Sequence, residues 1–190
     1  MNFYRQKIII GSLKTGGIGV LPTDTIYGLV GLALKPEAVQ RIHKLKDRDT
    51  NKPFIILIGE VADLEKFDIK LSPAQQKFLT TNWPGAISVI LSCPSPKFEY
   101  LHRGTGTIAF RLPSSKPLRE LLNATGPLVA PSANPEGQKP AKTIKEAKAY
   151  FGNQIDFYLS GKTKDTPSTL VKIEESGKIE ILREGRGKLK

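Results

Sequence analysis

The sequence predicts a single α/β domain built around a twisted, mixed β-sheet with helices on its faces. Three observations carry this prediction. Strand-like apolar runs alternate along the chain with helix-like segments. Several of these runs are apolar on both faces, as in strands that are covered from both sides. The chain has 190 residues, which suits one domain with a core of its own.

Helices are expected where apolar residues recur every three to four positions and where capping residues precede such a pattern. Ser72 followed by Pro73 supplies an N-cap and a first-turn proline. Thr143 and Glu146 form a capping-box pattern. In chain order, the predicted helices are residues 3–14, 36–46, 63–67, 72–80, 115–123 and 143–151.

Strands are expected in short apolar runs bounded by turn residues. Residues 24–34 are apolar but broken by Gly28 and Gly31, so we interpret them as a glycine-kinked stretch and not as a clean helix. Residues 93–106 contain several turn residues and are expected to form a loop. In chain order, the predicted strands are residues 17–21, 54–58, 86–91, 107–112, 128–130, 155–159, 169–173 and 178–182, the last two forming a hairpin.

The composition points to polyanionic partners and excludes several kinds of site. The chain has 29 Lys and Arg residues against 18 Asp and Glu residues, a formal net charge of +11. Such a charge is typical of proteins that meet nucleic acids, nucleotides or acidic membranes, and also of surfaces that are merely solvated. A single cysteine excludes a disulfide within the chain and a CxxC zinc finger, and neither His43 nor His102 has metal-ligand spacing. We therefore expect no protein metal site and a reducing cytoplasmic location.

The N-terminal residues lack the long apolar centre of a signal peptide. No apolar run approaches the roughly 18 residues that a membrane-spanning helix needs. We therefore expect no association with a membrane. We also expect the end of the chain, from about residue 186, to be a mobile basic tail.

Two polar segments in the first third of the chain follow apolar elements. Residues 22–28 (PTDTIYG) carry two threonine hydroxyls, a carboxylate and a tyrosine, which can orient a small polar ligand. A capped turn explains them equally well. In the segment 44–48, Lys46 and Arg48 are two positions apart, so in an extended loop both could hold phosphate oxygens. A solvated helix end explains this second segment slightly better.

Two further segments lie later in the chain. Residues 131–134 (PSAN) follow a predicted strand, and their hydroxyl and amide groups suit contact with a ribose, a phosphate or an adenine edge. On spacing alone, plain turn chemistry is the stronger reading of this segment. In the predicted hairpin, antiparallel pairing could bring Ser168 and Arg183 to the same end of the sheet. A polar strand cap and a basic tail are the alternative reading of these two residues.

Several familiar catalytic patterns are absent. The sequence contains no GxxxxGK[ST] loop, no GxGxxG, no GxSxG and no HExxH. If the protein is an enzyme, we expect it to work by positioning and electrostatics more than through a nucleophile of its own.

The order and spacing of the polar segments resemble the YrdC/Sua5 family. The matching strings span about residues 17–185 and read PTDTIYGL, KDR followed by KP, TIAFRLP, PSAN with a PEG turn, PSTLV and LREG. The resemblance implies a YrdC-like catalytic domain at residues 1–185 with a large, positively charged cavity, leaving residues 186–190 as the tail. It also implies a short form without the extra C-terminal domain of longer relatives.

The resemblance further implies an activity. It is the synthesis of L-threonylcarbamoyladenylate and pyrophosphate from L-threonine, bicarbonate and ATP, with Mg²⁺ accompanying the ATP. The product would pass to a separate threonylcarbamoyl-transferase complex that modifies an adenosine of tRNA. Direct binding of tRNA or another RNA is left open.

Residue roles follow from the same resemblance. Lys46 and Arg48 match a Lys-x-Arg motif that meets the nucleotide phosphates and serves catalysis. The expected threonine contacts are Thr25, Tyr27, Arg111 and Ser168. The expected nucleotide contacts, besides the Lys-x-Arg pair, are Thr107, Ser132, Asn134 and Arg183.

Two positions depart from the family pattern and keep two alternatives open. Asp49 stands where a proline often follows Lys-x-Arg, and Leu57 stands where some relatives carry a histidine. A paralogue that uses another amine or carbamoyl donor is therefore one alternative. The other is an RNA-binding module of the same fold, which the net charge favours. The ligand-type residues and the lack of an evident aromatic stacking surface speak against the second.

Overall fold

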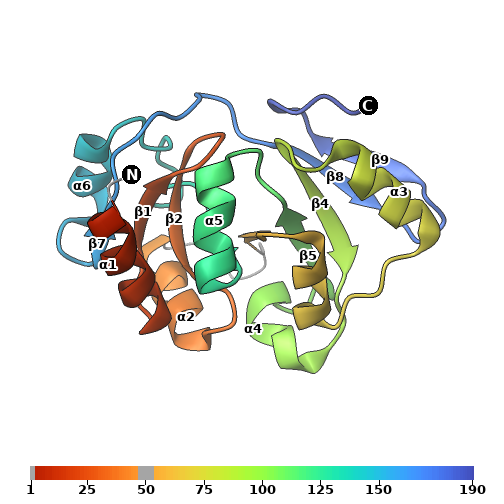
Figure 1. Ribbon diagram of the computed structural model, residues 1–190, viewed down its shortest axis with the longest axis horizontal. Coiled ribbons are helices and arrows are strands. Elements are labelled where there is room, and N and C mark those ends of the chain that lie inside the picture. The colour runs from red at the N-terminus through yellow and green to blue at the C-terminus, as the bar shows by residue number, and fades with distance from the viewer. Residues whose placement is uncertain (1–2, 47–53) are drawn as a thin grey trace.

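We describe residues 3–46 and 54–190 from a computed structural model (Figure 1), and the side chains from residue 6 onward. The predicted mixed α/β architecture is confirmed. The helices are α1 (Phe3–Lys14), α2 (Pro36–Lys46), α3 (Pro73–Asn82), α4 (Glu99–His102), α5 (Lys116–Thr125) and α6 (Ile144–Phe151), with short 3-10 helices η1 (Val61–Phe67) and η2 (Pro96–Phe98).

The strands form one continuous sheet with the order β7-β1-β2-β6-β3-β5-β4-β8-β9. Their bounds are β1 (Gly19–Pro22), β2 (Tyr27–Leu32), β3 (Ile55–Leu57), β4 (Ile87–Ser92), β5 (Thr107–Arg111), β6 (Leu128–Val129), β7 (Phe157–Tyr158), β8 (Thr169–Ile173) and β9 (Ile179–Arg183). The pairs β1–β7, β3–β5 and β4–β8 are parallel and the other pairs are antiparallel. The sheet is therefore mixed, as predicted.

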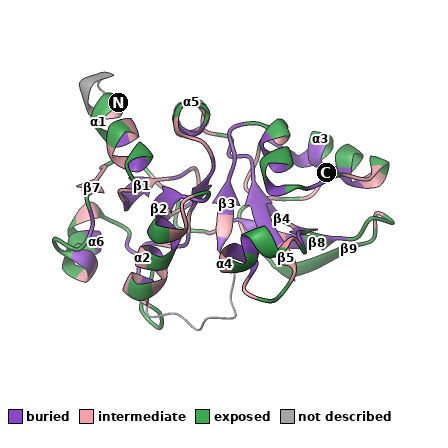
Figure 2. Ribbon diagram, turned by 90° about the horizontal axis from the view of Figure 1, so that it is seen from below, coloured by how far each residue is buried: buried purple, intermediate pink, exposed green. Residues whose placement is uncertain are grey.

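Two apolar clusters hold the helices against the sheet. One contains Leu13 of α1 and Leu122 of α5, packed with residues of the central strands. The larger cluster lies beneath α2, α3, α4 and α6 and includes Ile42, Phe78 and Phe110. Figure 2 shows the buried central strands between these layers, while β9 at the sheet edge is exposed along its length. Burial of this kind supplies most of the stabilisation of a domain of this size.

The capping signals in the sequence are largely confirmed. The hydroxyl of Ser72 accepts a hydrogen bond from Gln75 N at 3.2 Å, and the Gln75 side chain accepts one from Ser72 N at 3.0 Å. Thr143 caps α6 by accepting from Glu146 N at 3.1 Å. The Glu146 carboxylate, however, accepts from Lys142 N at 2.8 Å. It therefore reaches one residue further back than the expected capping box.

Two predictions of local structure are wrong. Residues 24–34, expected as a glycine-kinked stretch, contain strand β2, which is buried on both faces. A side chain at Gly31 would come within 2.9 Å of Ile18 Cγ2, so this glycine allows close packing on the strand. Residues 93–106, expected as a loop, contain η2 and α4. Segments this short are held by burial of Phe98 and Leu101 and carry no periodicity that sequence analysis can detect.

The end of the chain, expected as a mobile tail, packs against the sheet. Arg186 N donates to Pro167 O at 2.8 Å, Thr169 donates to Gly187 O, and Lys190 N donates to Asn82 Oδ1 at 3.1 Å. Leu189 contacts the larger apolar cluster. None of the helices in the described part of the chain combines the length and the apolar character needed to cross a bilayer.

Candidate functional site

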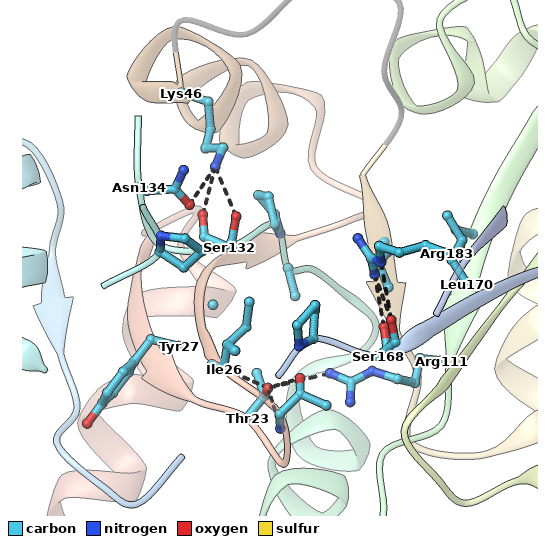
Figure 3. A pocket seen from close by; sticks show the side chains of 18 of the residues that line it. Thr23, Ile26, Tyr27, Lys46, Arg111, Ser132, Asn134, Ser168, Leu170 and Arg183 are labelled. Atoms are coloured by element: carbon cyan, nitrogen blue, oxygen red, sulfur yellow. Dashed lines mark hydrogen bonds between the residues drawn. The ribbon is translucent and has the colours of Figure 1, made fainter. Parts of the chain in front are cut away.

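A cavity of about 590 Å³ lies at the centre of the sheet (Figure 3). It is lined by the turn between β1 and β2, by strands β3, β4, β5, β8 and β9, and by the loop after β6. Every predicted site residue in the described ranges lines it: Thr25, Tyr27, Lys46, Thr107, Arg111, Ser132, Asn134, Ser168 and Arg183. Arg48 and Asp49 lie outside the described residues.

Lys46 enters the cavity because of its place on α2. Residues 38, 42 and 46 are spaced by four and lie on the same buried helix face. Lys46 is only 3% exposed, and its ammonium group lies 2.8 Å from Ser132 O and 3.4 Å from both Ser132 Oγ and Asn134 Oδ1. An ammonium group has three donors. Lys46 thus ties the end of α2 to the loop after β6.

That loop is itself held in shape by Asn134. Its amide nitrogen donates to Pro135 O at 2.8 Å and to Gln138 O at 2.7 Å. Ala133 N donates to Tyr27 O at 3.0 Å, which joins the loop to β2. The polar edge of the cavity on this side is therefore built from local turns fastened to the sheet.

The β8–β9 hairpin forms the opposite side of the cavity, and it brings Ser168 and Arg183 together as predicted. The Arg183 guanidinium donates to Ser168 O through Nη2 at 2.9 Å and through Nε at 3.3 Å. Burial lowers the pKa of Arg183. The Ser168 hydroxyl lies 2.8 Å from the hydroxyl of Ser88, which is fully buried on β4. Ser88 was not singled out from the sequence, where it is one polar residue within an apolar run.

Arg111, the last residue of β5, forms a buried ion pair with Asp24. Nη1 lies 2.6 Å from Asp24 Oδ1, and the two side chains are 5% and 7% exposed. Burial lowers the pKa of Arg111, the charge and hydrogen bond of Asp24 oppose that shift, and Arg183 adds to it. Nη2 also lies 3.5 Å from the hydroxyl of Thr23, which is 3.0 Å from the hydroxyl of Thr25. The sequence predicts that the Asp24 carboxylate either helps to orient a polar ligand or caps a turn, and it gives no sign of the ion pair with Arg111.

Tyr27 lines the cavity, as expected, and its hydroxyl has a further role. Its hydroxyl points away from Lys46 and Asn134 in Figure 3. It donates to Gly161 O at 2.6 Å and accepts from Gly161 N at 3.1 Å. A side chain at position 161 would come within 2.6 Å of Pro22, so glycine is needed there. Tyr27 thereby anchors the strap, which we define as residues 159–168, the segment that links β7 to β8 along the upper side of Figure 1.

The remaining lining is mostly apolar, with two carboxylates. Ile55, Ile90, Ala109 and Leu170 project from four neighbouring strands, and Glu136 and Asp165 add negative charge. Thr107 is the first residue of β5, and its hydroxyl lies 3.3 Å from that of Thr105. Within residues 3–46 and 54–190, no group of three or more His, Cys, Asp or Glu is placed to hold a metal ion. The expected positive charge of the whole cavity stays a prediction.

Leu57, which stands where some relatives carry a histidine, is fully buried and packs in the cluster beneath α1 and α5. It is not among the described residues that line the cavity. The side wall at this strand is formed by Ile55. The apolar character of position 57 is therefore explained by packing.

Comparisons with known proteins agree with the family resemblance of the sequence motifs. The family model Sua5/YciO/YrdC, described as "Telomere recombination", matches residues 11–185. The threonylcarbamoyl-AMP synthase of Hahella chejuensis is 30% identical over 161 residues, which are 84% of this chain and 87% of that protein. Sequence similarity therefore extends over most of both proteins.

Two solved structures have similar folds. The crystal structure of P. abyssi Sua5 complexed with L-threonine superposes with a TM-score of 0.87 at 26% identity over 96% of this chain. The match covers 54% of the P. abyssi protein, so this chain spans about half of its length. The crystal structure of E. coli YciO has a TM-score of 0.85 at 22% identity, covering 97% of this chain and 91% of that one.

Proposed function

This chain belongs to the Sua5/YciO/YrdC family, and we propose that it is a threonylcarbamoyl-AMP synthase. Its substrates would be L-threonine, bicarbonate and ATP, and its products threonylcarbamoyl-AMP and pyrophosphate. The name of the Hahella chejuensis relative and the L-threonine bound to P. abyssi Sua5 support this reaction class, which is that of a nucleotidyltransferase.

One observation carries the proposal. Lys46, Arg111 and Arg183 come from three elements far apart in the sequence and line one cavity together with hydroxyl and amide groups. A cavity of about 590 Å³ falls in the range of small-molecule and cofactor sites. An open RNA-binding surface would not need such a concentration of converging polar groups inside the sheet. The cavity therefore favours an enzyme over the RNA-binding module.

The proposed chemistry needs no nucleophile from the protein. The amine of threonine attacks the carbon of bicarbonate, and loss of water leaves a carbamate. One carbamate oxygen then attacks the α-phosphorus of ATP, and the bond to the leaving pyrophosphate breaks. The tasks left to the protein are to hold the two reactants in line and to exclude water.

The cations of the cavity suit those tasks. Both the carbamate and the triphosphate are anions, so their approach requires positive groups on each of them. Lys46 would contact the nucleotide, together with Ser132 and Asn134 of the loop that it holds. Arg111, Thr25 and Ser168 would contact threonine on the other side. Arg183 lines the same cavity as Arg111, and its charge lowers the pKa of Arg111, so an anion bound in the cavity would be attracted by both groups.

Mg²⁺ belongs to this proposal as a companion of ATP. Mg²⁺ in proteins keeps several waters and takes one or two carboxylates together with substrate phosphates. Glu136 and Asp165 line the cavity and fit that need. With ATP bound, the ion would share the charge that develops on pyrophosphate.

The fate of the product is part of the same proposal. A threonylcarbamoyl-adenylate is an activated acyl group, so a separate transferase must consume it. We propose tRNA adenosine as the final acceptor, in line with the resemblance of the motifs to the YrdC/Sua5 family.

The decisive experiment measures pyrophosphate release from ATP with Mg²⁺ and bicarbonate, in the presence and absence of L-threonine. We expect release to require threonine. Arg183→Ala should reduce it by about 100-fold or more, the usual cost of removing one preorganised charge-stabilising donor. Lys178→Ala, on the exposed turn of the same hairpin, serves as the matched control and should leave the rate unchanged.

Other outcomes would redirect the assignment. ATP binding without threonine-dependent release would overturn the synthase. If another amine then supported release, the chain would be the paralogue. Copurification with RNA that nuclease removes, without ATP binding, would favour the RNA-binding module.

A further inference from the structure

We propose that Asp24 is a positioning residue of the active site, which fixes the Arg111 guanidinium for binding of threonine. This inference rests on the proposed function. Asp24 approaches Arg111 Nη1 to 2.6 Å through Oδ1. Its other oxygen, Oδ2, accepts from Ser114 N at 2.9 Å and from Ser114 Oγ at 3.0 Å. The carboxylate is thus clamped between two parts of the chain.

The clamp joins elements on which the cavity depends. Asp24 lies in the turn between β1 and β2, whereas Arg111 ends β5 and Ser114 precedes α5. Asp24 therefore sets how the turn that carries Thr25 sits against the strand that carries Arg111. The chain of contacts continues through Thr23, whose hydroxyl lies between Arg111 Nη2 and the Thr25 hydroxyl. Figure 3 shows Arg111 pointing towards Thr23.

Asp24 acts through Arg111 and not on the ligand. Arg111 lines the main cavity, but Asp24 is not among the described residues that do so. Asp24 instead lines a separate hollow together with Ser114 and Ser115. Both of its oxygens are already occupied by donors. A role as general base towards the threonine amine would require the carboxylate to face the main cavity.

Electrostatics explains why a carboxylate is needed at this position. Arg111 is almost completely buried and lies near a second guanidinium, that of Arg183, and both effects lower its pKa. Without Asp24, Arg111 would be a buried cation without a counter-charge, and such a group moves or draws in water. With Asp24, one edge of the guanidinium is held and its direction is fixed. Preorganisation of this kind lowers the cost of binding a carboxylate ligand.

The experiment compares Asp24→Asn with the wild-type enzyme. Asparagine keeps the size of the side chain and removes its charge. Loss of a charge-assisted hydrogen bond that orients a ligand-binding group should raise the KM for threonine by about tenfold or more. The Kd for ATP, measured without threonine, should not become weaker. A purely structural role would not produce this split between the two ligands.

Two further variants keep the test decisive. Ser72→Ala removes the N-cap of α3, away from the cavity, and controls for a loss of stability alone. It should leave the KM for threonine unchanged. Ser114→Ala removes one of the two donors to Oδ2 and should raise that KM about threefold, a part of the cost of one hydrogen bond. If Asp24→Asn does not fold, Ser114→Ala decides the question.

Several results would overturn the inference. They are an unchanged KM for threonine in folded Asp24→Asn, an equal loss of threonine and ATP binding in that variant, or an equal rise of the KM for threonine in Ser72→Ala. If the wild-type protein shows no dependence on threonine, the proposed function fails instead. The geometry is then judged by the guanidinium Nη–H resonances of Arg111 in nitrogen-15 NMR, because Nη1 is the atom that donates to Asp24. These signals should be protected from solvent exchange in the wild type and lose that protection in Asp24→Asn, and unchanged signals would refute the clamp.

Discussion

The ammonium group of Lys46 lies 2.8 Å from the main-chain oxygen of Ser132 and so joins the end of α2 to the loop after β6. The two residues are separated by 86 positions in the chain. A lysine that the sequence suggests as a phosphate ligand is therefore also a support of the side of the cavity that we propose for the nucleotide.

Replacing Lys46 with methionine tests both roles. The variant keeps the aliphatic stem but leaves Ser132 O and Asn134 Oδ1 without this donor. Loss of the partner of a buried polar group costs about 1–3 kcal/mol, so the free energy of unfolding should fall by that amount. Binding of ATP should weaken as well, because the positive charge is lost. Urea unfolding and ATP titration measure the two effects, and a variant with unchanged ATP affinity would restrict Lys46 to the structural role.

Tyr27→Phe should loosen the strap without disturbing the core. The variant loses both hydrogen bonds to Gly161 and keeps the ring. Each hydrogen bond contributes about 0.5–1.5 kcal/mol, so a modest loss of stability is expected. Hydrogen exchange should accelerate at residues 161–165 and stay unchanged in α3. Exchange in the strap equal to that of the wild type would show that other contacts, such as the one from Lys164 N to Thr25 O, suffice to hold it.

The single cysteine should be inert in the native protein. Burial, and then the nearby charge of Asp68, raise the pKa of the Cys93 thiol from 9.0 to about 11. Because the thiolate is the reactive form, iodoacetamide at pH 8 should modify Cys93 far more slowly than it modifies the unfolded chain. Rapid labelling of the folded protein would contradict this prediction.

The same pKa shift predicts a change of stability at high pH. The native thiol holds its proton to a higher pH than the unfolded thiol does. Its contribution to stability is therefore complete below about pH 9 and is lost as the pH rises towards about 11. The difference in the free energy of unfolding between wild type and Cys93→Ala should be constant up to pH 9 and shrink above it. A difference that stays constant up to pH 11 would argue against the shift.

Removal of residues 187–190 should destabilise the domain. These residues contribute the contacts of Gly187 with Thr169, of Leu189 with the core and of Lys190 with Asn82. Burial of one leucine side chain is worth about 1.5–3 kcal/mol when it is complete, and Leu189 is only partly buried, so a loss of about 1–2 kcal/mol is expected. Thermal unfolding measures it, and Lys188→Ala in the full chain is the control for the charge. An unchanged melting temperature would support the mobile tail that the sequence suggested.

Local sequence signals determined the elements whose cause is itself local. The recurrence of apolar residues every three to four positions predicts α2, and Ser72 with Pro73 marks the start of α3. Both depend on contacts within a few residues, which a single sequence contains. The hairpin of β8 and β9 also has a local cause, because a short turn places its two strands side by side, where they pair. Its geometry brought Ser168 and Arg183 together as predicted.

The strings that resemble a known family also predicted which residues line the cavity, but not what each one contacts. Asp24 and Arg111 are 87 positions apart, and Tyr27 and Gly161 are 134 positions apart. Those contacts depend on strand order and register, which place β5 beside β3 and bring the strap over the turn between β1 and β2. Pairing between distant strands is decided by burial of the whole sheet and not by the residues of either strand alone. For that reason the sequence determined the kinds of groups in the site, and only the tertiary structure decided that Asp24 holds Arg111 and that the Tyr27 hydroxyl holds the strap.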